Sequence, residues 1–139
     1  MSKPTPSAIV DKMYDNDLFS KWLGIEILEK TKGSSKLKMV IREEMINGFG
    51  LAHGGITYSF ADSALAFASN SNGRLSMSIE TSISHTVSCK IGDTLYAHAK
   101  EESLSNKLGI YHISVTNQNN VTVALFKGTV YRTSKDWEV

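Results

Sequence analysis

The sequence predicts an α+β domain in which an antiparallel β-sheet wraps round one long central helix. Two observations support this fold class. Residues 54–71 are apolar or small almost throughout, with Asp62 as the one charged side chain in the run. Six other segments alternate polar and apolar residues with the period of two that is typical of β-strands. A helix without a charged face is a buried helix, and a sheet wrapped round it supplies the apolar surroundings.

The composition fits one domain that spans residues 1–139. Lys and Arg total 15 against 14 Asp and Glu, a net charge of +1, which argues against a dedicated nucleic-acid binder. The single cysteine, Cys89, excludes an internal disulfide and makes a cysteine zinc cluster a poor interpretation. Residues 1–11 lack the apolar core of a secretory signal, and the central run is too short and too polar to span a membrane. We therefore expect a cytoplasmic protein that does not insert into membranes.

The expected order of elements is a short helix, two strands, the central helix and four strands. Residues 1–7 hold two prolines and are expected to be loose, with Ser7 as the cap of a helix over residues 8–16. A further helical turn fits residues 18–22. The first two strands are expected to pair as a hairpin and the last three as a meander. The expected strands cover residues 23–29, 36–42, 76–84, 94–103, 108–116 and 121–132.

The N-terminus of the central helix has features that suit the binding of a negatively charged oxygen. At 1.5 Å per residue the run makes a helix about 27 Å long, and Gly73 is available for a left-handed cap at its end. Gly54 and Gly55 stand at the start, where the first N–H groups lack intrahelical partners and the helix dipole is positive. With no side chain there, a substrate carbonyl could approach those N–H groups. Taken alone, the glycine pair could also serve only a tight turn.

Asp62 lies eight residues beyond Gly54, which is about 12 Å along the same helix. Burying a carboxylate is costly, so Asp62 is either satisfied locally, by Ser59 or Ser63, or kept for chemistry. Reacting atoms must approach within about 3.5 Å, so Asp62 and Gly54 of one helix cannot serve the same carbonyl carbon. If both act, they come from two copies of the helix that lie side by side and antiparallel. The spacing thus predicts a homodimer with shared active sites.

Several motifs along the chain belong together. The most specific is His53-Gly54-Gly55 with an acid, Asp62, nine residues after the histidine. Others lie at residues 13–17, 23–25, 47–48, 68–71, 92–95 and 122–128. In these segments the chain resembles the PaaI-type (phenylacetate-degradation) group of hotdog-fold thioesterases. The resemblance covers most of the chain and implies the hotdog fold.

The resemblance also implies an activity: hydrolysis of acyl-coenzyme A thioesters by a homodimer, paired into a dimer of dimers, without a metal or other cofactor. Asp62 matches the carboxylate that drives hydrolysis, either as a general base on water, which we favour, or by attacking the thioester itself. The Gly54 N–H matches the group that polarises the thioester carbonyl. Asn47 matches a residue that positions substrate or water, and Ser78 a hydroxyl that some relatives use on the following strand.

Four further residues are candidates for catalysis or substrate contact. His53 could orient the loop or donate to the thioester region, or could simply pack the loop. Gly55 also lies at the N-terminus of the central helix. Tyr58 could shape an acyl or aryl pocket, or pack in the core. Coenzyme A phosphates need cations, and the candidates at loops and strand ends are Arg74, which we favour, Lys90, Lys107 and Arg132.

We predict an acyl-CoA thioesterase acting on medium-chain acyl or aryl-acetyl esters, with Asp62 activating water and the Gly54 N–H as oxyanion hole. One alternative is a hotdog module that binds acyl-CoA without turnover. Another is a dehydratase of hydroxyacyl thioesters, which typically pairs an acid with a catalytic histidine. We interpret Cys89 as structural. The remaining histidines show no metal-ligand spacing and are expected to be half-buried on strands: His85, His98 and His112.

Overall fold

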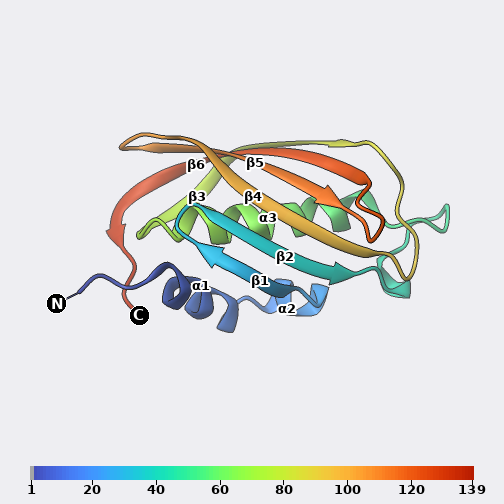
Figure 1. Ribbon diagram of the computed structural model, residues 1–139, viewed down its shortest axis with the longest axis horizontal. Helices are drawn as coiled ribbons and strands as arrows, with labels where there is room; N and C mark the ends of the chain where they lie inside the picture. The colour runs from blue at the N-terminus through green and yellow to red at the C-terminus, as the bar shows by residue number, and fades with distance from the viewer. Residues whose placement is uncertain (1) are drawn as a thin grey trace.

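The computed structural model describes residues 2–139 and shows a six-stranded antiparallel sheet curved round one long helix (Figure 1). The strands follow the order β1-β2-β4-β5-β6-β3 across the sheet. The predicted α+β arrangement is confirmed. The helices are α1 (Pro6–Asp15), α2 (Leu18–Leu23), the 3-10 turn η1 (Glu43–Met45) and α3 (Gly54–Asn70). The strands are β1 (Glu26–Thr31), β2 (Ser34–Val40), β3 (Arg74–His85), β4 (Thr94–Leu104), β5 (Leu108–Thr116) and β6 (Thr122–Asp136).

The sheet pairs as the alternation predicts in two places: β1 and β2 form a hairpin, and β4, β5 and β6 form a meander. Strand β3 instead crosses the molecule and pairs with β6, so that β1 and β3 are the two edges of the sheet. Gly128 of β6 is required by packing, because a Cβ atom there would overlap the Leu65 side chain of α3. The concave face of the sheet is thereby held close to α3.

Helix α3 is buried along most of its length, as its apolar sequence predicts. Its last residue, Asn70, accepts hydrogen bonds from the Ser76 N–H (2.8 Å) and from Trp137 Nε1 (2.8 Å), which joins the helix to the start of β3. Near its other end the Tyr58 hydroxyl bonds to the Thr81 hydroxyl of β3. Helix α3 and strand β3 therefore lie side by side and run antiparallel. No helix within residues 2–139 is long and apolar enough to cross a lipid bilayer.

The N-terminal elements differ from the prediction. Helix α1 begins at Pro6 with Thr5 as its cap, whose hydroxyl accepts the Ala8 N–H at 3.1 Å, so the predicted Ser7 cap is wrong. Proline suits the first turn, where its missing N–H would lack a partner anyway. Of the segment expected to be loose, residues 6–7 are therefore helical and Met1 lies outside the described residues.

Strand β1 starts later than predicted because α2 is longer than one turn. Asp17 caps α2 by accepting the Ser20 N–H at 2.9 Å, and the helix then continues to Leu23. Gly24 ends it in the left-handed conformation, with φ of 77°. At the end of α3, by contrast, the right-handed Ser71 is the cap, and Gly73 takes its positive φ of 113° in the turn that follows.

Candidate active site

The loop before α3 is tied down at both ends, which fixes the position of the helix mouth. Asn47 Oδ1 accepts the N–H groups of Phe49 (2.9 Å) and Leu51 (3.2 Å), so this side chain closes its own turn. The Ala52 N–H donates to the Cys89 carbonyl at 2.8 Å, which anchors the loop to the segment after β3. The main role of Asn47 Oδ1 is therefore to shape the loop. In the described chain its amide Nδ2 has no hydrogen-bond acceptor.

The Gly54 N–H is an unpaired donor at the N-terminus of α3. His53 is the N-cap of the helix, and its Nδ1 accepts the Gly55 N–H at 2.8 Å. The Ile56 N–H donates to the His53 carbonyl at 2.9 Å. Within residues 2–139 the Gly54 N–H makes no hydrogen bond. The N-terminus of α3 thus presents one N–H donor, that of Gly54, at the positive end of the helix dipole, as an oxyanion hole requires.

A pocket of about 340 Å³ opens in front of this donor. It lies between the N-terminus of α3, the loop before that helix and the end of β3. Of the predicted site residues, it brings Gly54 and Asn47 together. Its lining consists of Asn47, Leu51, Ala52, Gly54, Thr57, His85, Thr86, Val87, Ser88 and Cys89. No lysine, arginine or carboxylate is among them.

Two lining residues, Thr57 and His85, were missed as site residues by the sequence reasoning. The Thr57 hydroxyl lies 3.1 Å from the Gly54 carbonyl oxygen and 3.2 Å from His85 Nδ1. His85 ends β3 and is exposed in the pocket, so the expectation of a half-buried strand histidine is wrong. Its Nε2 lies 3.3 Å from the place that a Cβ at position 54 would occupy. Thr57 lies about one helical turn after Gly54 and so on the same side of the helix. This spacing could have predicted it as a site residue.

Asp62 lies two turns along α3 and outside this pocket. Its carboxylate receives no hydrogen bond from any described residue. Ser63 does not satisfy it, because the Ser63 hydroxyl bonds instead to the Ser20 hydroxyl at 2.8 Å, which joins α3 to α2. Burial, with the negative charge of Asp17 as a second cause, raises the pKa of the Asp62 carboxyl. A raised pKa improves a carboxylate as a proton acceptor near neutral pH.

The other predicted site residues occupy separate places. His53 and Gly55 line a separate hollow of about 300 Å³, together with the α2 aromatics Phe19 and Trp22. Ser78 is exposed on β3, between Ser76, which bonds to Asn70, and Thr81, which bonds to Tyr58. Tyr58 packs edge-on against Phe126, with ring centroids 5.3 Å apart, and does not reach the pocket.

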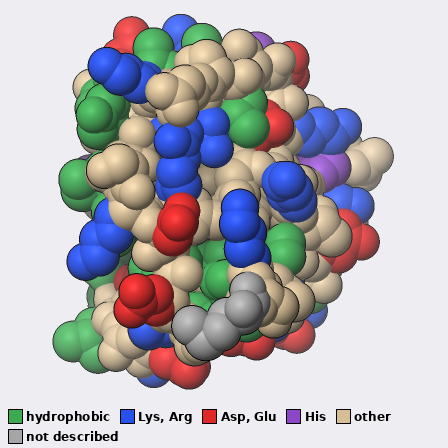
Figure 2. All heavy atoms as spheres, turned by 90° about the vertical axis from the view of Figure 1, so that its left-hand side faces the viewer, with side chains coloured by type: hydrophobic (Ala, Val, Ile, Leu, Met, Phe, Trp, Pro, Cys, Tyr) green, Lys and Arg blue, Asp and Glu red, His purple; other side chains and the backbone are tan. Residues whose placement is uncertain are grey.

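Arg74 lies at the far end of the molecule, at the start of β3. Its guanidinium donates to the side chain (3.2 Å) and the carbonyl of Asn106. Lys and Arg side chains gather on this end, and Arg74 and Arg132 line the same hollow there (Figure 2). Lys90, in contrast, directly follows Cys89 of the active-site pocket. The cations considered for coenzyme A phosphates are thus split between the two ends of one chain.

Cys89 is buried at the back of the pocket, and burial together with the charge of Asp93 raises the pKa of its thiol to about 11. The thiol stays protonated at neutral pH and is a poor nucleophile. This agrees with the structural role expected for Cys89. In the part of the chain that the structure describes, no three His, Cys, Asp or Glu side chains gather as a metal site.

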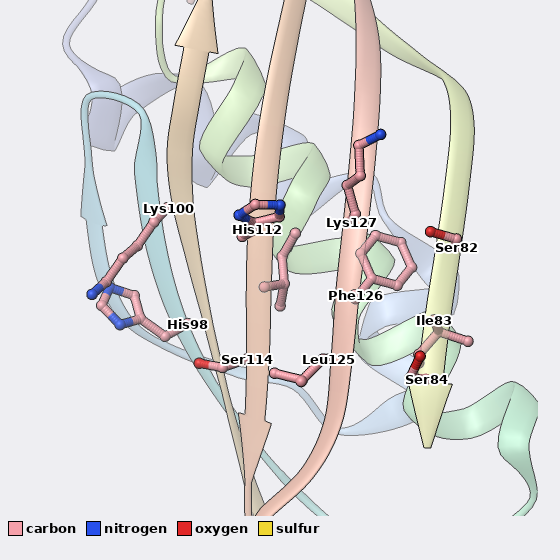
Figure 3. Close-up of a pocket in the computed structure, with 11 residues that line it drawn as sticks. Ser82, Ile83, Ser84, His98, Lys100, His112, Ser114, Leu125, Phe126 and Lys127 are labelled. Atoms are coloured by element: carbon pink, nitrogen blue, oxygen red, sulfur yellow. The ribbon is translucent and has the colours of Figure 1, made fainter. Parts of the chain in front are cut away.

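A second pocket, of about 490 Å³, lies on the outer face of the sheet (Figure 3). His98 and Lys100 of β4, His112 of β5 and Lys127 of β6 project from neighbouring strands, and α3 lies behind the sheet. Burial and the charges of Lys36 and Lys100 lower the pKa of His98, although the charge of Glu29 opposes them. This pocket contains neither a helix N-terminus nor Asp62, so it lacks the groups that thioester hydrolysis needs.

Comparison with known proteins identifies the family. Residues 49–124 match the family model of the thioesterase superfamily. A protein of Archaeoglobus fulgidus is 43% identical over 93% of this chain and 84% of its own length. Acyl-coenzyme A thioesterase PaaI of Escherichia coli is 38% identical over 86% of this chain and 86% of its own.

Solved structures identify the same family. The E. coli PaaI protein from the phenylacetic acid degradation operon has a TM-score of 0.92 at 34% identity, with 94% of this chain and 95% of that one covered. A Streptococcus mutans protein bound to acetyl-CoA has a TM-score of 0.79 at 26% identity, with 81% of this chain and 91% of that one covered. The resemblance carried by His53-Gly54-Gly55 and Asp62 is therefore confirmed, and the chain belongs to the thioesterase superfamily as a hotdog-fold, PaaI-type thioester hydrolase.

Proposed function

We propose that the protein hydrolyses acyl-coenzyme A thioesters to the free acid and coenzyme A, with medium-chain acyl or aryl-acetyl groups as its substrates. The observation that carries the proposal is the unpaired Gly54 N–H, which faces a pocket of about 340 Å³ at the positive end of α3. Coenzyme A esters are supported by two relatives, because the E. coli protein is an acyl-CoA thioesterase and the S. mutans structure holds acetyl-CoA. A cytoplasmic location is part of the same proposal.

The active site is shared between two copies of the chain. Strand β3 is an unpaired edge of the sheet, and its side chains Met77 and Ile79 are 58% and 62% exposed. Tyr58, which bonds to this strand, is four residues from both Gly54 and Asp62. Antiparallel pairing of two β3 edges about an axis near Tyr58 lays the two α3 helices side by side in opposite directions. Gly54 of one copy then faces Asp62 of the other.

In this arrangement Asp62 of the partner subunit takes a proton from water, and the water oxygen attacks the thioester carbonyl carbon. The carbonyl oxygen becomes an oxyanion and accepts the Gly54 N–H, which stabilises it. The carbon–sulfur bond then breaks, its electron pair leaves with the sulfur, and the proton on Asp62 passes to the thiolate. In this proposal Asn47 Nδ2 donates to substrate or water in the pocket, and Ser78 on the following strand supplies a further hydroxyl.

The same pairing gives Arg74 a role. Antiparallel β3 strands bring the start of one strand beside the end of the other, so Arg74 of one copy approaches the pocket of its partner, where residues 85–89 lie. A guanidinium at that position suits the phosphates of coenzyme A. Two such dimers then pair into a dimer of dimers.

The direct test is a panel of coenzyme A esters read as kcat/KM from thiol release. We expect the highest values for medium-chain or aryl-acetyl esters. Binding without thiol release would favour the non-catalytic module, and loss of water from a 3-hydroxyacyl ester, seen by product analysis, would favour the dehydratase. Either outcome would overturn the proposal.

The shared site makes activity depend on the β3 edge. We expect Ile79→Lys to give monomers and to lower turnover at least about 100-fold, because each chain alone lacks the acid for its own pocket. Sedimentation and thiol release measure the two effects. Leu28→Lys is the matched control, since Leu28 is an exposed apolar residue on the opposite edge strand, β1. An active Ile79→Lys monomer would contradict the shared site.

A further inference from the structure

His85 lines the pocket in front of the Gly54 N–H, although its position in the sequence gave no sign of it. It is the last residue of β3 and lines the pocket that contains Gly54 and Asn47. Its Nε2 lies against Gly54, 3.3 Å from the place of a Cβ at that position. Any side chain at position 54 would crowd the ring. Glycine here therefore does two things: it opens the N–H to substrate, and it makes room for the imidazole.

The hydrogen bonds of Thr57 favour one tautomer of the neutral His85 ring. The Thr57 hydroxyl is 3.1 Å from the Gly54 carbonyl oxygen, which can only accept, so the hydroxyl proton is donated there. The same hydroxyl is 3.2 Å from His85 Nδ1, and with its own proton on the Gly54 carbonyl it accepts the Nδ1–H. A neutral imidazole has one N–H, and in this geometry it is on Nδ1. The lone pair is then on Nε2, the atom that lies beside Gly54.

No other side chain of the pocket can take this role. The lining holds no lysine, arginine, aspartate or glutamate, and the Cys89 thiol stays protonated because its pKa is raised to about 11. The Thr57 hydroxyl is already engaged with Gly54 and His85. His85 Nε2 is thus the one basic lone pair that this protomer contributes near the free Gly54 N–H, which would hold the carbonyl oxygen.

We propose that His85 is a further catalytic residue, whose Nε2 accepts a hydrogen bond from the attacking water and holds it in line with the thioester carbonyl carbon. The inference rests on the proposed function. One water proton passes to Asp62 of the partner subunit and later to the departing sulfur, and the other stays on the oxygen that becomes the acid product, bonded to Nε2. Nε2 accepts a hydrogen bond in this step and takes no proton, and Thr57 is the positioning residue that orients the ring.

The test compares three variants of the enzyme by kcat and KM on its best coenzyme A ester. His85→Phe keeps a flat ring and removes both nitrogens, and we expect kcat to fall about 10- to 100-fold with KM nearly unchanged. His85→Gln keeps an acceptor near the place of Nε2 and should retain more activity than the Phe variant. His112→Gln, on the exposed outer face of β5, is the matched control and should equal the parent.

A double-mutant cycle with Thr57→Val separates a positioning role from a structural one. If Thr57 acts through His85, Thr57→Val lowers kcat in the parent but has no further effect in His85→Phe. Additive losses, or a kcat for His85→Phe within about threefold of the parent, would overturn the inference. Asp62→Asn distinguishes the two proposals: if that variant is inactive while His85→Phe is fully active, the role of His85 fails and the proposed function stands.

Discussion

Asp62→Asn is expected to lower kcat for coenzyme A esters by about 100- to 10,000-fold, the range that a positioned general base contributes. The amide keeps the size of the carboxylate and cannot take a proton from water. KM should change little, because Asp62 acts on water and not on the bound ester. Thiol release measures the effect, and unchanged turnover would remove Asp62 from the mechanism.

The same substitution is expected to stabilise the fold above the ordinary pKa of an aspartate. Burial and the charge of Asp17 raise the pKa of Asp62, so the unfolded chain releases this proton more readily than the folded one. Such a group lowers the free energy of unfolding as pH rises through the two pKa values. Asp62→Asn should therefore have a higher Tm than the parent at about pH 8, and the difference should disappear near about pH 3. Thermal melts at both pH values measure it.

Gly54→Pro is expected to lower kcat by about 100- to 1,000-fold, the usual cost of losing one oxyanion-hole donor. Proline suits the first position of a helix, and His53 before it already has the extended conformation that proline requires, with ψ of 138°. The substitution therefore removes the N–H without displacing the helix. Circular dichroism and Tm check that α3 is retained.

Gly54→Ala is the matched control for the proline variant. Both substitutions place a Cβ atom about as close to His85 Nε2, at 3.3 Å on ideal geometry, but alanine keeps the N–H. The alanine variant should lose several-fold in kcat and the proline variant much more. Equal losses in the two variants would assign the effect to crowding of His85 and would leave the oxyanion role of the N–H without support.

Most of the fold could be predicted from local patterns. The apolar run from Gly54 predicts α3 to within one residue, and strict alternation predicts β5 as found. Errors arose where a helix cap competed with a strand pattern: Leu23 alternates like a strand residue but ends α2, because Asp17 caps that helix and Gly24 stops it. Local periodicity carries no information on which of the two outcomes wins.

Only part of the candidate site could be predicted, because some of its residues are far apart in the sequence. Gly54 and Asp62 stand out because glycine at a helix start and a carboxylate in an apolar helix are both locally unusual. The contact of His85 with Thr57 joins residues 28 positions apart, and it exists only because β3 runs antiparallel to α3 for its full length. Side-chain packing decides which residues of a helix and a strand face each other, so no pattern within one sequence predicts this contact.

The shared active site is tested most directly by mixing two inactive variants. In a heterodimer of Asp62→Asn and Gly54→Pro chains, one site keeps an intact Gly54 from the first chain and an intact Asp62 from the second. Co-expression with two affinity tags isolates these heterodimers, and random pairing predicts that the unfractionated mixture recovers about a quarter of the parent activity. Thiol release at that level, from two chains that are each inactive alone, is the result that we predict. A mixture as inactive as its parts would contradict a site built from two subunits.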